Sequence, residues 1–448
     1  MTDSKVLASR LGVSKNATLA LYGLGVVAFI AYIWTNGHAN GAAMGWLVYW
    51  CLIALGLAAM PRLPLVGVCC YVMLAYGMSS HGPELDIMLS MRMLDVAVVL
   101  ILVGWLLTGQ QQPPKHGNNN YLIFSGSVLL TWLAFSLAVA LLRGTPYGTF
   151  LRHDPSGYLQ AAVLFWVTRN VVKTRADCAL LAAAIGVMVL VRTWLQGAAG
   201  IYLESYVATL LVIGAPLALL GMFAGHNRLL QYGFGAGALA MLVALAMTQN
   251  RAAAVAFAVV VMVFIWQTRR IRLGKWLVAM VVVAAIGLMF APSSYVDRFR
   301  ALLDPAQTHA TAGLDRGTAA ERLELWSAGW QMAMDQPITG VGPGNYPAAL
   351  GIYLSGKGLL AAHSNYVQML AEAGFPGLVL YLAFFLGVLV MLDRIRRSGP
   401  AQWQQRSAQM LQLALVAYLV GGIFNSRQDF VLAYVLAGWA LALRDIKS

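Results

Sequence analysis

The chain has 448 residues, of which 60% are hydrophobic and only 10% are charged, and its mean hydropathy is +0.71. This composition excludes an ordinary soluble enzyme and predicts many apolar runs of about 20 residues, the length that crosses a bilayer. The formal net charge of +13 does not indicate nucleic-acid binding, because the basic residues are scattered through short loops and form no patch with interleaved aromatic residues. Membrane topology and anionic, lipid-linked partners account for the charge better.

Apolar runs of about 17 or more residues predict an all-α polytopic membrane protein with about 12 to 14 transmembrane helices. The predicted spans lie near residues 17–34, 44–60, 62–78, 91–108, 121–142, 158–172, 178–195, 205–224, 229–247, 252–268, 275–291, 374–392, 408–424 and 428–443. Lys5, Arg10 and Lys15 precede the first span without a small-residue cleavage site after it, so we expect that span to stay uncleaved.

The charges of the connecting loops predict how the chain is oriented. If the N-terminus is cytoplasmic, every second connection is cytoplasmic too, and each of these carries lysine or arginine, as the positive-inside rule requires. Both termini are therefore expected in the cytoplasm. Beside Arg92 at the start of a span, the basic residues on the opposite side are nearly all arginine: Arg143, Arg152, Arg192, Arg251, Arg298, Arg300, Arg316, Arg322, Lys357 and Arg427.

This bias towards arginine predicts a phosphate-binding outer face, because the guanidinium fork binds phosphate oxygens with two hydrogen bonds. The alternative is that arginines at the ends of spans extend to the lipid headgroups. Arg192 and Arg251 favour the functional interpretation most, since each lies in strongly apolar sequence at the outer end of a span. A charge in such surroundings is expected to face a water-filled cavity or a ligand.

One long outer segment divides the chain into N-terminal spans over 1–291, a loop over 292–373 and C-terminal spans over 374–448. Within the loop, Thr318 and Glu321 form a capping box, apolar residues follow at helical spacing, and Pro337 ends the run. A helix on the outer surface is predicted here. The next stretch, ITGVGPGNYP, lacks the Lys-Ser/Thr of a phosphate loop, so we interpret it as a turn.

His363 precedes a second short predicted helix, SNYVQMLAEAG, with Gly374 as its C-terminal cap. The positive end of a helix dipole disfavours imidazolium, and a neutral imidazole can accept a proton. A hydrogen-bonded histidine at the membrane interface is the alternative. The outer carboxylates show no metal-ligand clustering, and Cys51, Cys69, Cys70 and Cys178 lie in apolar runs without zinc-site spacing. We therefore expect no metal site.

The loop and the start of the next span resemble the O-antigen ligase and O-antigen polymerase superfamily. The pattern consists of Arg, then Trp, Gly and Met, then Pro-x-x-Gly-x-Gly, then His-x-Asn-Tyr and Glu-x-Gly-x-x-Gly. Its positions in this chain are Arg322, Trp326, Gly329, Met332, Pro337, Gly340, Gly342, His363, Asn365, Tyr366, Glu372, Gly374 and Gly377.

The resemblance implies a bacterial inner-membrane glycosyltransferase of the GT-C kind with its active site in a periplasmic cavity. In the ligases of this superfamily, undecaprenyl-diphosphate glycan is the donor and a sugar hydroxyl of the lipid A core is the acceptor. The implied reaction inverts the anomeric centre and uses neither metal, ATP nor a bound cofactor. His363 is implied as the base or orienting group, and Arg192, Arg251 and Arg322 as the arginines that bind the diphosphate. Arg192 is assigned by its place in the layout of spans rather than by a matched motif.

Three alternatives stay open. A polymerase of the superfamily would use a second lipid-linked glycan as acceptor, and a protein O-oligosaccharyltransferase would use a peptide hydroxyl. The short loops after residue 373 disfavour the latter, because those relatives usually carry a further periplasmic domain. A transporter of lipid-linked glycan would need many spans and arginines in a cavity, but it would not need His363, and we expect internal repeats in it that inspection does not find.

Overall fold

The computed structural model describes residues 64–77, 96–106, 120–143, 156–198, 205–225, 228–248, 250–268, 319–355 and 360–446. In these ranges the chain forms helices joined by turns, without a β-strand, which confirms the predicted all-α fold. The predicted spans near 17–34, 44–60 and 275–291 lie outside the described residues.

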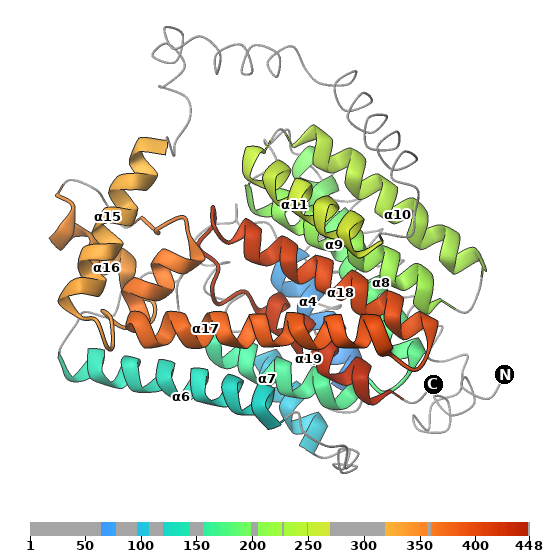
Figure 1. The fold of residues 1–448 in the computed structure, drawn as a ribbon, viewed down its shortest axis with the longest axis horizontal. Coiled ribbons are helices and arrows are strands. Elements are labelled where there is room, and N and C mark those ends of the chain that lie inside the picture. The colour runs from blue at the N-terminus through green and yellow to red at the C-terminus, as the bar shows by residue number, and fades with distance from the viewer. Residues whose placement is uncertain are drawn as a thin grey trace, which may run out of the picture.

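Every predicted span within the described part of the chain coincides with a helix (Figure 1). The helices are α4 (Pro64–Gly77), one over Val96–Leu106, α6 (Asn120–Leu142), α7 (Ser156–Val171), α8 (Arg175–Ala198), α9 (Ser205–Ala224), α10 (Arg228–Met247), α11 (Arg251–Gln267), α15 (Ala319–Asp335), α16 (Tyr346–Tyr353), α17 (Asn365–Ser398), α18 (Gln402–Gly421) and α19 (Val431–Asp445). The predicted outer helix is α15, and it ends two residues before Pro337. The sequence did not predict α16.

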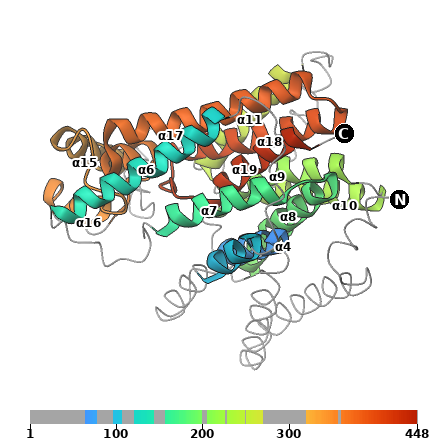
Figure 2. The same ribbon diagram turned by 90° about the horizontal axis from the view of Figure 1, so that it is seen from below.

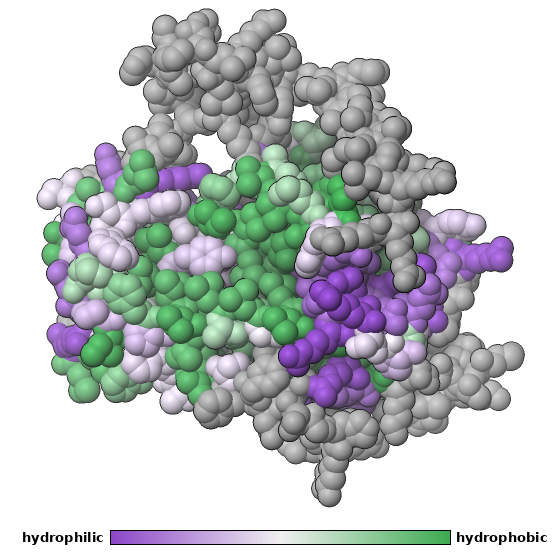
Figure 3. Space-filling model, in the orientation of Figure 1, coloured by the Kyte–Doolittle hydropathy of each residue, from purple (hydrophilic) through white to green (hydrophobic). Residues whose placement is uncertain are grey.

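The apolar helices make this chain a multi-pass membrane protein. Five described helices are long and apolar enough to cross a bilayer, over Ser125–Leu142, Arg175–Trp194, Val207–Ala224, Arg228–Met247 and Asn365–Ser398, and shorter apolar helices accompany them. Hydrophobic residues cover the middle of the visible face, while hydrophilic residues gather at its right, towards the end of α17 (Figure 3). The total of about 12 to 14 spans stays a prediction.

The helices pack in an order that places α9 centrally and α6 and α10 at the edge. In α9, 78% of the candidate span is buried inside the protein, against 22% in α6 and 17% in α10. The helix α9 packs against α8, α10, α11 and α18, while α17 packs against α6, α15, α18 and α19. Large apolar side chains on α6 and α10, such as Phe135 and Leu239, are exposed.

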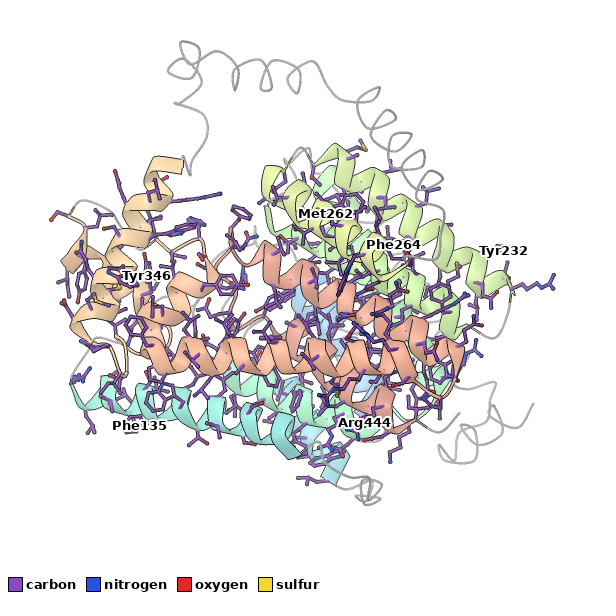
Figure 4. All side chains as sticks on the ribbon, in the orientation of Figure 1. Phe135, Tyr232, Met262, Phe264, Tyr346 and Arg444 are labelled. Carbon is purple, nitrogen blue, oxygen red and sulfur yellow. The ribbon has the colours of Figure 1, made fainter. Side chains whose placement is uncertain are left out.

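Hydrogen bonds define two opposite ends of the bundle. The backbone N–H of Asn365, at the start of α17, donates to the carbonyl of Gly422 after α18 (2.7 Å), and Asn425 donates to Thr209 near the start of α9 (3.1 Å). We call this end, which also carries α15 and α16, the loop end. At the far end, Arg175 donates to the last carbonyls of α9. Tyr346 and Arg444 lie at these opposite ends (Figure 4).

Candidate functional site

The helix α15 is anchored to the rest of the loop end through its buried side. Leu325, Ala328 and Met332 recur at helical spacing and belong to a small apolar core that includes Tyr346 of α16 and Ala371 of α17. The Tyr346 hydroxyl donates to the carbonyl of Leu325 (2.6 Å). These contacts hold α15, and with it Arg322 and Trp326, against α16 and α17.

The glycine-rich stretch after α15 is a turn, as predicted, and it interlocks with α17. Gly340 and Gly342 have positive φ values of 62° and 99°, which glycine adopts at little cost. The N–H groups of Val341 and Gly342 donate to the carbonyls of Ala371 and Glu372, both at 2.9 Å. These carbonyls lie just before the break in α17, where helical partners are missing. The turn therefore supplies the hydrogen bonds that the break removes.

The break in α17 occurs at Gly374, which the sequence predicted as a cap. Gly374 has φ 70° and ψ −175°, outside helical geometry, and the N–H of Phe375 donates to the carbonyl of Pro337 (2.9 Å). A Cβ atom on Gly374 would overlap the carbonyl oxygen of Ile338. The chain thus needs glycine here for its backbone conformation and for the close approach of the turn.

Side chains of α6, and Arg143 directly after it, support the same turn. The Ser136 hydroxyl donates to the carbonyl of Thr339 (2.5 Å), and the indole N–H of Trp132 donates to the carbonyl of Ala373 (2.9 Å). Arg143 donates to the Thr339 hydroxyl (3.2 Å) and to Gln336. Arg143, one of the outer arginines of the sequence, therefore holds the turn in place.

His363 lies directly before the N-terminal cap of α17, with a backbone φ of 52°. A residue other than glycine in this left-handed region costs about 1 kcal/mol, so the surrounding structure must hold it there. Two contacts do so. The indole N–H of Trp326 donates to the carbonyl of Ala362 (3.0 Å), and the N–H of Ser364 donates to the Ser426 hydroxyl (3.1 Å).

Electrostatics favour the neutral form of His363, whose side chain is exposed. The pKa of its imidazole is lowered from the usual value, first because the surrounding protein partly removes water from the ring and second because the Arg322 guanidinium repels the charged form. Glu321 opposes this shift. The structure thus brings together two predicted site residues, Arg322 and His363, and leaves the histidine able to accept a proton.

The segment after α18 completes the surroundings of His363. The N–H of Arg427 donates to the Asn365 side-chain oxygen (2.5 Å), and the Tyr366 hydroxyl donates to the carbonyl of Leu419 (2.5 Å). Asn365 and Tyr366, which follow His363 in the His-x-Asn-Tyr pattern, therefore join the start of α17 to the end of α18. Their hydrogen bonds fix the backbone next to His363.

Glu372 is a site residue whose place the sequence did not predict. Its side chain is buried and accepts hydrogen bonds from Gln368 (3.0 Å), from the N–H of Tyr346 (3.3 Å) and from Gln428 (3.2 Å). It thereby joins α17, α16 and the segment after α18. The one sequence feature that could have indicated its importance was its place in the Glu-x-Gly-x-x-Gly pattern. Its charge alone did not distinguish it from the other outer carboxylates.

Arg192 and Arg251 lie on other helices at the loop end. Arg192 is buried near the end of α8, with 3% of its surface exposed, and Arg251 is the first residue of α11. Because α9 starts at the loop end and consecutive helices joined by short connections run antiparallel, α8 and α10 end there and α11 starts there. The two arginines therefore share this end with Arg322 and His363, as the alternation of charges predicted.

We expect Trp326→Phe to lower the unfolding temperature of the protein in detergent, because it removes the donor that holds the Ala362 carbonyl. The loss of one hydrogen bond should cost about 1 kcal/mol of stability and let the strained backbone relax. Trp330→Phe is the matched control one turn further along α15, since its ring packs edge-on against Phe375 and phenylalanine keeps that contact. Equal unfolding temperatures of the two variants would contradict this role for Trp326.

The fold and site together define a class: a helical multi-pass membrane protein with a histidine and several arginines gathered at one end of its bundle. The family model described as O-Antigen ligase matches residues 236–382, a stretch that contains α11, α15, α16, Arg322 and His363. This match supports membership of the chain in the O-antigen ligase superfamily, the family that the motif resembles. No curated protein matches the chain.

Proposed function

We propose that this protein is an O-antigen ligase, which transfers glycan from undecaprenyl diphosphate to a sugar hydroxyl of the lipid A core. The observation that carries the proposal is the placement of His363. Its backbone is held in a strained conformation at the start of α17. Partial burial and the nearby Arg322 lower the pKa of its imidazole. A group held in this way is oriented before its substrate arrives.

In the proposed reaction, the acceptor hydroxyl oxygen attacks the anomeric carbon of the donor sugar while a ring nitrogen of His363 accepts the hydroxyl proton. The bond between the anomeric carbon and the diphosphate oxygen breaks on the opposite face, so that the configuration inverts and undecaprenyl diphosphate leaves. Negative charge develops on that oxygen, and guanidinium groups stabilise it. Arg322 is the nearest candidate, with Arg192 and Arg251 as further diphosphate ligands. No metal ion takes part in this proposal.

The proposed orientation places the loop end in the periplasm and both termini in the cytoplasm of a Gram-negative bacterium, with the protein in the inner membrane. The far end carries Arg169, Lys173, Arg175, Arg228, Arg394, Arg396, Arg397, Arg406 and Arg444 in the described ranges. The positive-inside rule favours this end as the cytoplasmic one. A lipid diphosphate donor suits the other side, because transfer from it needs no nucleotide.

Reconstitution with defined substrates tests the proposal. The purified protein in liposomes is incubated with undecaprenyl-diphosphate glycan, with and without lipid A core, and the products are separated by size. A ligase attaches glycan to the lipid A core and forms no product without it. Longer undecaprenyl-linked glycan in the absence of lipid A core would instead identify a polymerase, and the acceptor facing His363 would then be a second lipid-linked glycan.

The lowered pKa of His363 predicts the shape of the pH profile. A base must be neutral to act, so kcat/KM should fall on acidification with a midpoint below about 6.5, the ordinary value for histidine. Arg322→Gln removes the neighbouring positive charge, which raises the pKa and should move this acid limb to higher pH as well as lowering the rate. Arg228→Gln, at the far end, is the control and should leave the limb in place. An unmoved midpoint in Arg322→Gln would contradict the assigned contact.

A further inference from the structure

The outward surface of α15 is divided into an apolar and a polar stripe. Leu323, Trp330 and Met334 are exposed by 64%, 52% and 46%. At about 100° per residue, they fall within roughly 40° of one another around the helix axis. The exposed residues Glu324, Gln331 and Asp335 form a second stripe roughly 100° to one side. Small Ser327 is the one polar residue within the apolar stripe.

The apolar stripe is continuous with the lipid-facing surface of α17. Trp330 packs edge-on against Phe375, with 5.9 Å between the ring centroids. Phe375 begins a row of exposed apolar residues along the candidate membrane span, followed at helical spacing by Val379, Leu386 and Val390. The exposed apolar surface therefore passes from α17 onto α15 without a polar boundary between them.

The direction of α15 also differs from that of the spanning helices. Figures 1 and 2 show α6 and α17 running side by side and α15 crossing the end of this pair. A helix that lies across the ends of spanning helices is parallel to the plane of the membrane. Amphipathic helices in this position place their apolar side in the boundary between headgroups and acyl chains, and tryptophan is enriched at that depth.

We propose that α15 is an interfacial helix that is seated in the lipid leaflet at the loop end, with Leu323, Trp330 and Met334 in contact with phospholipid acyl chains. The polar stripe then faces water. Arg322 and Trp326 lie on the side of α15 opposite to the polar stripe, at about 100° per residue. On that side Trp326 contacts the segment that carries His363. Membrane lipid, rather than a protein, is the partner of this surface.

Photocrosslinking in membranes tests this assignment without any glycan donor, so its outcome is independent of the transfer reaction proposed above. The full chain carries p-benzoylphenylalanine in place of Met334 or, as matched control, of Gln331, which is also exposed. Each protein is reconstituted into vesicles of phosphatidylethanolamine and phosphatidylglycerol with alkyne-tagged acyl chains, irradiated and scored for lipid adducts by mass spectrometry. We expect severalfold more lipid adduct at position 334 than at position 331.

A second pair, Leu323 and Glu324, repeats the comparison near the N-terminal end of α15. It shows whether the result depends on the misfolding of a single variant. Here too the apolar position should capture lipid and the polar position should not. Equal lipid capture within the pairs, or capture at none of the four positions, would overturn the proposal. So would a crosslink from position 334 to a second copy of the chain, because the stripe would then be a protein interface.

Discussion

His363→Ala should lower glycan transfer by at least about a hundredfold, because positioned general bases contribute at least this much to proton transfer in enzymes. Donor binding should change little, since Arg322, Arg192 and Arg251 keep their charges. Initial rates in liposomes, together with the binding of labelled undecaprenyl-diphosphate glycan, separate these two effects. His363 is exposed, so the substitution removes little packing.

His363→Gln is the control for shape, because glutamine keeps a polar side chain that can orient a hydroxyl but cannot act as a base near neutral pH. Activity in the glutamine variant alone would assign His363 an orienting role. Wild-type activity in both variants would remove the histidine from the reaction altogether.

Gly374→Ala should have the largest effect on folding among single substitutions at the loop end. Its φ of 70° and ψ of −175° lie in a region that is open essentially to glycine alone and costs about 1 to 3 kcal/mol for other residues. The added Cβ would also overlap the carbonyl oxygen of Ile338, so the turn must separate from α17. Thermal unfolding in detergent and the yield of monodisperse protein measure the loss.

Gly351→Ala is the matched control, because a Cβ atom on this glycine of α16 meets nothing within 4 Å. Alanine is the better helix former, so the variant should be as stable as the wild type or slightly more stable. If both substitutions leave the unfolding temperature unchanged, the turn and α17 do not depend on each other as described.

Local sequence signals predicted the individual elements of the loop end well. Pro337 and the glycines after it predicted the end of α15 and the turn, and Gly374 predicted the break in α17. Each is a local signal, carried by a residue with unusual backbone freedom or constraint. The helix α16 escaped prediction because it is short and lies among turn residues.

Contacts between distant parts of the chain were not predictable in the same way. Ser136 and Trp132 hold the turn from a helix about 200 residues earlier, and their sequence surroundings show only an apolar span. Glu372 looks like one outer carboxylate among many until its burial is known. Charge alternation across the spans predicted that Arg192, Arg251 and Arg322 share one end, but only the packing of α15 against α17 brings Arg322 to His363.

The proposed function requires that Arg322 binds the donor diphosphate at the loop end, close to His363. An undecaprenyl diphosphate analogue with a photoreactive group beside the diphosphate, crosslinked to the protein in liposomes and mapped by mass spectrometry, tests it directly. We expect adducts in α15 and in residues 360–366 that excess undecaprenyl-diphosphate glycan suppresses. Adducts confined to the far end of the bundle, or adducts at the loop end that the donor does not suppress, would contradict it.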